Sequence, residues 1–485
     1  MEPVALLLLA VIGMPAPFRP NVRVDRQNLP GHHCYSPVIA VGPGAPVQPI
    51  YLVFEDDSLQ LFQDPTRIDV AFQKSTDGGA TWLSEHKLIC RGEPFAQYPD
   101  LTTDDDGNVY VVYGQRPELN KGHPYCVRST DAGASWSAPV KVDDNEATVR
   151  SGAASIAVDA AGNLFCAWNE ERNGYLRIFS SVSTDHGATW SPSVRVDDDT
   201  VNSDCGVSDI FVQPVTNHYL VAAICPYVVR PGWNSSHAYL YRSTDMGRTF
   251  QPGIQLDTLE YTGSCYVVAD NRHIICDYTG YPRGTSLSST QARTLFTPPD
   301  TWGPYSQVTD TMYNSYYSCE LALSADGRAH TALNTNYQNG VYDVCYSFST
   351  DYGVSWSEQV RINDDTTAER QAPAIAADSA GFVYLAWVDE CGGGDHIWFS
   401  TNSPAGVAEQ RPQPIGMRPF ATVVRGALRL PTANCSLLSI DGREVMDLKP
   451  GANDVRALAP GVYFIRQALG VKRDAPDITK VIITQ

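Results

Sequence analysis

The stretch Ser75-Thr76-Asp77-Gly78-Gly79-Ala80-Thr81-Trp82 decides the fold, because the chain repeats it. Copies run from Ser129 to Trp136, Ser183 to Trp190, Ser243 to Phe250 and Ser349 to Trp356. The aligned aspartates are 54, 54, 60 and 106 residues apart, and the last interval is about two steps long. We therefore expect a degenerate copy at Ser289 to Phe296, and Ser400-Thr401-Asn402 is a truncated one. This gives seven units.

Each copy follows two short apolar runs that are separated by a turn, as in Ala154–Asp159 and Gly162–Trp168. Such runs with Asp-Gly or Gly-Asn between them are typical of β-hairpins. A third strand ends in Ser-Thr-Asp, and a fourth follows the Trp, as in Ser193–Asp197. Four strands at a period near 50 residues predict an all-β chain folded as a β-propeller. Seven blades are favoured, and six or eight are compatible with the spacing.

The repeated aspartates are expected to be structural. An Asp after Ser-Thr can accept backbone N–H groups of its own turn, the glycine two residues later can take a positive φ, and the final Trp can cap the blade. Replacing one of them should therefore harm folding rather than catalysis. The residues concerned are Asp77, Asp131, Asp185, Asp245 and Asp351.

This repeat resembles the Asp-box, or bacterial neuraminidase repeat, of sialidase-superfamily propellers over roughly residues 22 to 405. The resemblance implies a sialidase-like β-propeller. It does not by itself imply catalysis, because one fold carries many functions. Ring closure follows from the chain ends: Asn21–Asp25 reads as a fourth strand without a blade, and the last unit lacks one. We expect the two to pair, which would leave no open sheet edge.

Composition indicates an exported protein of more than one domain. The boundaries we expect are residues 1–20 for a signal peptide, 21–405 for the propeller, 406–418 for a Pro-rich linker and 419–485 for a small β domain. The apolar run Val4–Ile12 is too short to span a bilayer but suits a signal peptide, and no other segment is long enough for a transmembrane helix. A formal charge of -19 argues against nucleic-acid binding.

The twelve cysteines include no Cys-x-x-Cys pair, so a zinc site is not indicated. Cys265 with Cys276, and Cys205 with Cys225, could each face one another across a hairpin. Disulfides and free buried thiols are both left open, because disulfide geometry is strict. No cofactor is expected, except that Asp197-Asp198-Asp199 or Asp364-Asp365 could hold structural calcium.

The last 65 residues or so resemble the C-terminal sorting domain of the type IX secretion system. The resemblance is carried by the Asp441-Gly442-Arg443 turn, by Pro460-Gly461-Val462-Tyr463-Phe464-Ile465-Arg466, and by the apolar terminus that begins at Lys480. It implies that the secretion machinery is a partner and that the protein ends up secreted, extracellular or at the cell surface. A plain immunoglobulin-like accessory module is the alternative.

Function is expected on one face of the ring. The repeated turn joins strands three and four, so the loops from strand two to three and from strand four to the next blade lie on the opposite face. These loops carry Glu55, Asp56, Asp57, Arg91, Arg116, Arg150, Asn169, Glu170, Glu171, Arg172, Tyr227, Arg230, Trp233, Asp277, Tyr278, Arg283, Tyr313, Tyr316, Tyr317, Asn334, Asn336, Tyr337, Arg370, Asp389, Glu390 and His396. Carboxylates, arginines and aromatic rings together suit a sugar ligand.

A sialidase needs three arginines around one carboxylate, a Tyr nucleophile with a Glu, and an Asp as general acid/base. The family's Arg-x-Pro motif falls on Tyr35-Ser36-Pro37, so its arginine is replaced by Tyr35, and Phe18-Arg19-Pro20 is a poor substitute. The catalytic candidates are Tyr278 with Glu170 or Glu171. The ligand-binding candidates are Arg116, Arg172, Arg230, Arg283, Arg370, Tyr337 and Asp389.

Because the motif arginine is missing, we expect a propeller that binds glycan or protein ligands through its loop face without classical sialidase activity. Whether the protein is an enzyme stays open. The alternative is an exo-acting glycoside hydrolase of the exo-α-sialidase type.

Overall fold

The computed structural model divides into two compact units, Met1–Ala408 and Glu409–Gln485. In the first unit it describes residues 17–25, 33–44, 47–57, 68–90, 96–118, 121–147, 149–198, 204–230, 233–282, 288–297, 300–309, 315–336, 341–365, 367–391 and 394–404. In the second it describes residues 422–424, 427–430, 435–438, 443–449, 451–455, 458, 461–467 and 478–483. The proposed signal peptide core, Val4–Ile12, lies outside these ranges. Within them the chain is all-β, with no helix long and apolar enough to cross a bilayer.

Antiparallel groups of four strands, the blades, follow one another along the first unit. The first three are β2 (Cys34–Val41), β3 (Ile50–Asp56), β4 (Asp69–Ser75) and β5 (Lys87–Leu88); β6 (Ala96–Thr103), β7 (Val109–Glu118), β8 (Lys121–Ser129) and β9 (Val140–Lys141); and β10 (Val149–Val158), β11 (Leu164–Arg172), β12 (Tyr175–Ser183) and β13 (Val194–Arg195). The second and third blades share one sheet, because the start of β10 pairs with β8.

The remaining blades repeat this pattern. They are β14 (Gly206–Gln213), β15 (His218–Arg230), β16 (Trp233–Ser243) and β17 (Ile254–Gln255); β18 (Tyr261–Ala269), β19 (His273–Tyr281), β20 (Ser289–Phe296) and the short β21 (Thr301–Trp302) and β22 (Ser306–Gln307); β23 (Ser315–Leu323), β24 (Ala329–Asn336), β25 (Tyr342–Ser349) and β26 (Val360–Arg361); and β27 (Arg370–Ala377), β28 (Val383–Cys391), β29 (Gly394–Thr401) and β1 (Val22–Arg23).

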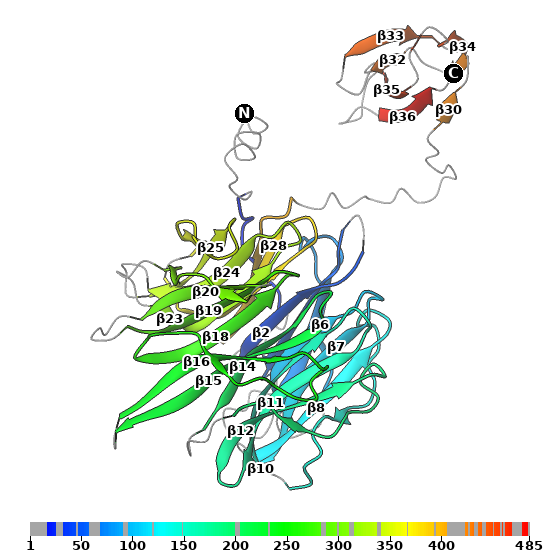
Figure 1. The fold of residues 1–485 in the computed structure, drawn as a ribbon. Coiled ribbons are helices and arrows are strands. Elements are labelled where there is room, and N and C mark those ends of the chain that lie inside the picture. Colours follow the sequence, from blue (N-terminus) through cyan, green and yellow to red (C-terminus); the bar gives the residue numbers. More distant parts are fainter. Residues whose placement is uncertain are drawn as a thin grey trace. The chain divides into compact units, whose positions relative to one another are not determined.

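The first strands of the blades form a closed ring. Each of β2, β6, β10, β14, β18 and β23 contacts the first strand of the next blade, and β27 contacts β2. Figure 1 labels the first six of these strands in the ribbon of the first unit. This closed order makes the unit a β-propeller. The N-terminal β1 completes the last blade by pairing with β29, where Val22 faces Phe399 and Arg23 faces Trp398. The expected pairing of the two chain ends is therefore confirmed.

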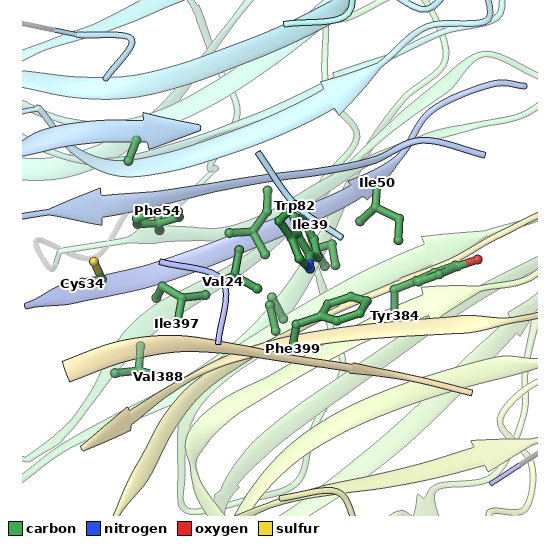
Figure 2. Packing of buried hydrophobic residues seen from close by; sticks show 14 residues of the cluster. Val24, Cys34, Ile39, Ile50, Phe54, Trp82, Tyr384, Val388, Ile397 and Phe399 are labelled. Carbon is green, nitrogen blue, oxygen red and sulfur yellow. The ribbon is translucent and has the colours of Figure 1, made fainter. Parts of the chain in front are cut away.

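An apolar cluster fills the seam where the ring closes. Val24 from the N-terminal segment packs with Phe54 of the first blade and Ile397 of the last, and Trp82 meets Phe399 edge to face at 5.0 Å (Figure 2). Burying aromatic and aliphatic surface of this kind contributes about 1.5 to 3 kcal/mol for each side chain. The seam is thus held by the same hydrophobic packing as the other blade interfaces.

The repeated turns are closed by their own aspartates. Asp77 accepts a hydrogen bond from the backbone N of Thr81 at 2.8 Å and from its hydroxyl at 2.6 Å, and the Ser75 hydroxyl donates to Asp77 at 2.8 Å. The other four copies repeat these bonds, with Ser135 and Ser355 in the Thr position of two. Gly79 has a φ of 83°, and a Cβ there would lie 2.2 Å from the Phe399 ring. Glycine is therefore required here for two reasons: the backbone conformation is left-handed, and the Phe399 ring leaves no room for a Cβ.

The box aromatics pack on the preceding blade rather than capping their own. Trp82 lies against Phe399 of the last blade, and Trp136 lies 5.1 Å from Phe72 of the first. The expected degenerate copy at Ser289–Phe296 is wrong. These residues form β20, and Thr290 and Thr294 pair with β19 in its interior. The β-branched threonines favour a strand, so the true connection follows Phe296.

The second unit is a separate all-β module. Its larger sheet has the order β30 (Thr422–Val424), β36 (Ile478–Ile483), β35 (Gly461–Gln467), β32 (Cys435–Leu438) and β33 (Glu444–Leu448), with β30 parallel to β36. A smaller sheet pairs β31 (Ala427–Leu430) with β34 (Gly451–Asp454). Leu437, Leu448 and Val455 are buried in this unit.

Neither of the two considered disulfides is present. Cys225 and Cys276 both carry free thiols, and the Cys225 sulfur lies 3.7 Å from the Tyr241 hydroxyl. On the β18–β19 hairpin, Cys276 faces Val267 and Cys265 faces Tyr278, so these two cysteines are offset along the ladder. A disulfide needs adjacent, facing Cβ atoms, which this register does not provide.

Candidate functional site

The face opposite the box turns carries an irregularity at the start of every first strand. Each first strand shifts register against its second strand by a bulge near its beginning. In three adjacent blades the bulge residue precedes a proline and has a positive φ: Ser36 at 50°, Tyr98 at 52° and Ala372 at 46°. Left-handed backbone is uncommon for these residue types, and strained positions cluster at functional sites. We call this part of the face the rim.

Glu55 holds two of the rim bulges. At the end of β3 it accepts a 2.7 Å hydrogen bond from the backbone N of Tyr98, and it also accepts one from the Ser36 side chain. Burial raises the pKa of Glu55, while these two bonds and the nearby Arg116 charge oppose the increase. The sequence suggested the Glu55 carboxyl for ligand binding. In the structure it is buried and holds the bulges at Ser36 and Tyr98 in place.

Two tyrosine residues at the starts of first strands are exposed. Tyr98 is 43% exposed, and the Arg116 guanidinium lies 4.9 Å from its ring centre. Tyr261 begins β18 and is 38% exposed. Both were missed in the sequence, although the Tyr98-Pro99 pair was a usable signal because it repeats the Ser36-Pro37 pattern. Rigidly held, exposed aromatic rings suit ligand contact.

A second polar group lies at the same rim, between the first and last blades. Tyr35 hydrogen-bonds to the Asp395 carboxylate, and His33 Nδ1 lies 2.6 Å from the same carboxylate. Burial and then the Asp395 charge raise the pKa of Tyr35 well above its usual range, so its hydroxyl stays protonated. Glu390 lies nearby, accepts a 2.9 Å hydrogen bond from Gln371, and has its pKa raised by burial and by Asp395. The rim is therefore acidic.

The catalytic candidates are not brought together. Glu170 is buried and accepts hydrogen bonds from Asn145 at 2.5 Å, Trp168 at 3.0 Å and Arg172 at 2.8 Å, so its carboxylate is fully engaged. Tyr278 is buried in the apolar cluster between the fourth and fifth blades. Burial raises its pKa well above the usual range. Glu171 is partly exposed, with Arg150 3.8 Å away.

Arg370 and Asp389 do meet, but inside the protein. Arg370 is fully buried at the start of β27, and its Nε donates to Asp389 at 3.0 Å. Its other nitrogens lie 3.9 Å from Asp343 and 3.8 Å from Asp365, and one donates to the Ala368 carbonyl. Because Arg370 is fully buried, its guanidinium presents no exposed edge to a ligand carboxylate, although Nη2 makes no hydrogen bond with a described residue.

Most face residues expected in loops lie at the ends of strands. The hairpins continue their pairing further than the sequence indicated; Arg172 still faces Tyr175, with Asn173 and Gly174 at positive φ in the turn. From these strand ends, Arg116 donates to the Ser151 carbonyl at 3.0 Å, Asn169 accepts from the Val207 N at 2.8 Å and Asn334 donates to the Arg370 carbonyl at 2.6 Å, each partner lying in the next blade. Asp277, in the middle of β19, accepts a hydrogen bond from Thr331 of the next blade at 3.0 Å. These side chains therefore form hydrogen bonds between neighbouring blades.

Other candidates sit elsewhere or outside the described residues. His396 is buried and pairs with Asp25 at 3.0 Å, and Asp56 pairs with His86. The residues Arg91, Arg283, Tyr313 and Tyr337, and the side chains of Tyr227, Arg230, Trp233, Tyr316 and Tyr317, lie outside the described structure. Asp197 accepts from Ile178 and Arg195, and Asp364 bonds Asn21. No group of carboxylates, histidines and cysteines suited to a metal occurs among described residues, and calcium stays a prediction.

Three carboxyls line the inside of the ring from alternate blades. Asp100, Asp209 and Glu320 each accept a backbone N–H from the first strand of the next blade, at Ile156, Val267 and Ile375, at 2.8 to 3.0 Å. These three residues are only partly exposed to solvent. Burial raises the pKa of Asp100 to about 6, and burial together with the neighbouring acids raises those of Asp209 and Glu320 well above the usual range.

Replacing Glu320 with Gln should make stability less dependent on pH. The pKa of Glu320 is raised in the folded chain, so its contribution is intact below the unfolded value near 4.5 and is lost as pH rises toward the folded value. Gln keeps an acceptor for Ile375 and cannot ionise. We expect the variant to match the natural protein at about pH 3.5, below the unfolded pKa, and to exceed it by more than about 1 kcal/mol at pH 8. Urea unfolding at both pH values measures this, and a variant that is less stable at pH 8 would contradict it.

No family model matches the sequence, and no curated protein matches it. Solved structures similar to it include a protein of unknown function from Dyadobacter fermentans, with 18% identity, 79% of this chain and 98% of that chain covered, and a TM-score of 0.48. A Hadza microbial sialidase shows 14% identity, 74% coverage of both chains and a TM-score of 0.46. A Trypanosoma rangeli sialidase shows 12% identity, 79% and 58% coverage, and a TM-score of 0.47. No residue's role is transferred at these identities.

Proposed function

We propose that this sialidase-like propeller binds a neutral glycan through its rim and lacks classical sialidase activity. One observation carries the proposal: the described arginines of this face are already engaged. Arg370 is enclosed by carboxylates, Arg172 bonds Glu170, Arg116 bonds the Ser151 carbonyl, and Arg150 pairs with Asp204. Recognition of an acid sugar depends on free guanidinium groups. The acidic rim would also repel such a ligand.

The exposed rings support a sugar as the ligand. Tyr98 is presented by a strained backbone that Glu55 holds, and Tyr261 offers a second ring at the same end of a first strand. Ligand sites combine such apolar faces with a few polar groups, and here Tyr35, Asp395 and Gln371 can exchange hydrogen bonds with ligand hydroxyls. A protein ligand remains an outcome of the test below.

One observation favours glycoside hydrolysis as a second candidate. Tyr35 is hydrogen-bonded to Asp395, and His33 orients that carboxylate. A nucleophile beside a base that a third group positions is a recurring catalytic arrangement. The raised pKa of Tyr35 and the absence of a free arginine cluster among the described residues make binding the better supported of the two.

Replacing Tyr98 with Ala is expected to weaken binding of a neutral oligosaccharide at least about tenfold, because a stacked ring contributes about 1 to 3 kcal/mol. Tyr305 provides a matched control: it is also 43% exposed, with an arginine 4.6 Å from its ring centre. A glycan array with the purified full chain, followed by calorimetry on the best ligand, measures the effect. Equal losses in both variants, or no glycan binding beside clear protein binding, would contradict the proposal.

A glycoside panel run on the same samples separates binding from cleavage. We expect no release of fluorophore from a sialoside. Release from any glycoside that is lost in the Tyr35→Phe variant would establish the second candidate instead.

We further propose export, with the C-terminal unit as the sorting signal. Support comes from the residue resemblance and from a second, separate β unit. Cell fractionation tests this, and recovery from the periplasm alone would contradict it.

A further inference from the structure

A groove of about 530 Å³ lies between the box turns of the third and fourth blades, on the face opposite the rim. Its walls combine apolar side chains with a few polar groups. Trp190 and Pro192 come from the third blade, and Met246 and Arg248 from the box of the fourth. A volume of several hundred Å³ with this mixture is typical of small-molecule sites.

Arg248 is the one charged residue that lines the groove. It is exposed, and it makes no ion pair or side-chain hydrogen bond with any residue in the described ranges. The turn itself does not need it, because the equivalent positions of the other boxes hold Ala80, Ala134, Ala188 and Val354. An arginine in one of five copies, at a position where the fold accepts alanine, points to a role outside folding.

The adjacent acids do not compete for this arginine. Asp185 accepts two hydrogen bonds from Thr189 and one from Ser183, and Asp245 has the same three donors in its own turn. Burial would raise the pKa of Asp185, but these bonds outweigh it and hold the pKa at about 2. Both carboxylates are therefore hydrogen-bonded within their own box turns and do not pair with Arg248. The Arg248 guanidinium can accept a ligand carboxylate as its partner.

We propose that this groove binds a pyranose that carries one carboxylate, such as a hexuronate. Arg248 would receive the carboxylate, because guanidinium and carboxylate pair in a bidentate manner. The Trp190 ring and the Met246 side chain would cover the apolar side of the sugar ring, and the exposed Thr184 hydroxyl would bond a ring hydroxyl. The site is independent of the rim, which takes a neutral ligand.

Calorimetric titration of the full chain with methyl glucuronide and with methyl glucoside tests the proposal. The glucuronide should bind and the glucoside should bind at least tenfold more weakly, as expected for a charge-assisted hydrogen bond. A methyl sialoside, which has the same charge on a bulkier ring, identifies the source of the carboxylate. Binding of either acid sugar above the glucoside supports the proposal; equal binding of all three, or no binding, overturns it.

Variants place the site. Arg248→Ala should abolish the preference for the acid sugar while the protein stays folded, because three other boxes hold alanine there. Trp190→Phe should weaken binding of both sugars, and Phe is tolerated at the box end because Phe250 occupies it in the fourth blade. Val354→Ala, the same position in another box, should bind as the natural protein does. Loss of glucuronide binding in Tyr98→Ala, with Arg248→Ala unchanged, would assign the ligand to the rim and overturn the inference.

Discussion

Replacing Arg370 with Ala should lower the free energy of unfolding by about 3 to 5 kcal/mol. Arg370 is fully buried, donates to Asp389 at 3.0 Å and lies 3.9 Å from Asp343, which is also buried. Removing the cation leaves these carboxylates to repel one another in a medium that screens charge poorly. It also deprives the start of β27 of the bond to the Ala368 carbonyl.

Urea unfolding followed by tryptophan fluorescence measures this loss. Arg248→Ala is the matched control, because Arg248 is exposed and has no described side-chain partner; its unfolding free energy should change by less than about 0.5 kcal/mol. An Arg370→Ala variant that keeps full stability but loses ligand affinity would show that Arg370 faces a ligand, as the sequence suggested. That result would also weaken the proposal for a neutral glycan.

Replacing Phe399 with Ala should cost about 3 to 5 kcal/mol, because the ring is buried in the seam that closes the propeller. Phe399 packs against Trp82 at 5.0 Å and covers Gly79, whose missing Cβ makes room for it. The cavity would lie between the first and last blades, where this cluster, the β1 pairing and hydrogen bonds such as that between His396 and Asp25 hold the chain ends together (Figure 2).

Thermal unfolding checks this second expectation, with Val360→Ala as the control because Val360 is 53% exposed at a blade edge. Limited proteolysis adds a readout specific to the seam: cleavage near the N-terminal β1 should become faster in Phe399→Ala alone. An unfolding transition within about 1 kcal/mol of the natural protein would mean that the seam relaxes to fill the cavity.

The repeat made the fold predictable. Five copies of Ser-Thr-Asp in register predicted the all-β class and the propeller, which is confirmed, and the unpaired Asn21–Asp25 predicted the closing strand. These inferences hold because turn chemistry and strand periodicity are local properties. The prediction of a degenerate box at Ser289 was wrong for the same reason. Without the Asp and the Gly the segment has no turn-forming residues, its strand propensity decides, and it forms β20.

The candidate site was far less predictable. Glu170, Arg370 and Glu55 are polar residues at the expected end of the blades, but each forms hydrogen bonds with other residues of the propeller and is buried. Tyr98 and Asp395, which lie at the rim, were not selected from the sequence, although the Tyr98-Pro99 pair repeats the Ser36-Pro37 pattern. Whether a polar residue meets solvent or a neighbouring blade depends on how far the strands extend and where the bulges fall, and these are set by pairing between distant segments.

The sequence alone therefore determined the repeating blade, its box turns and the way the ring closes, because a turn carries its own donors and acceptors within eight residues. The tertiary structure alone decided which arginines stay free. A charge that lies 19 residues from its carboxylate along the chain, as Arg370 does from Asp389, becomes buried only when two strands pair and the neighbouring blade covers them. Arg248 remains free because its side chain is exposed in its box turn and pairs with no described residue.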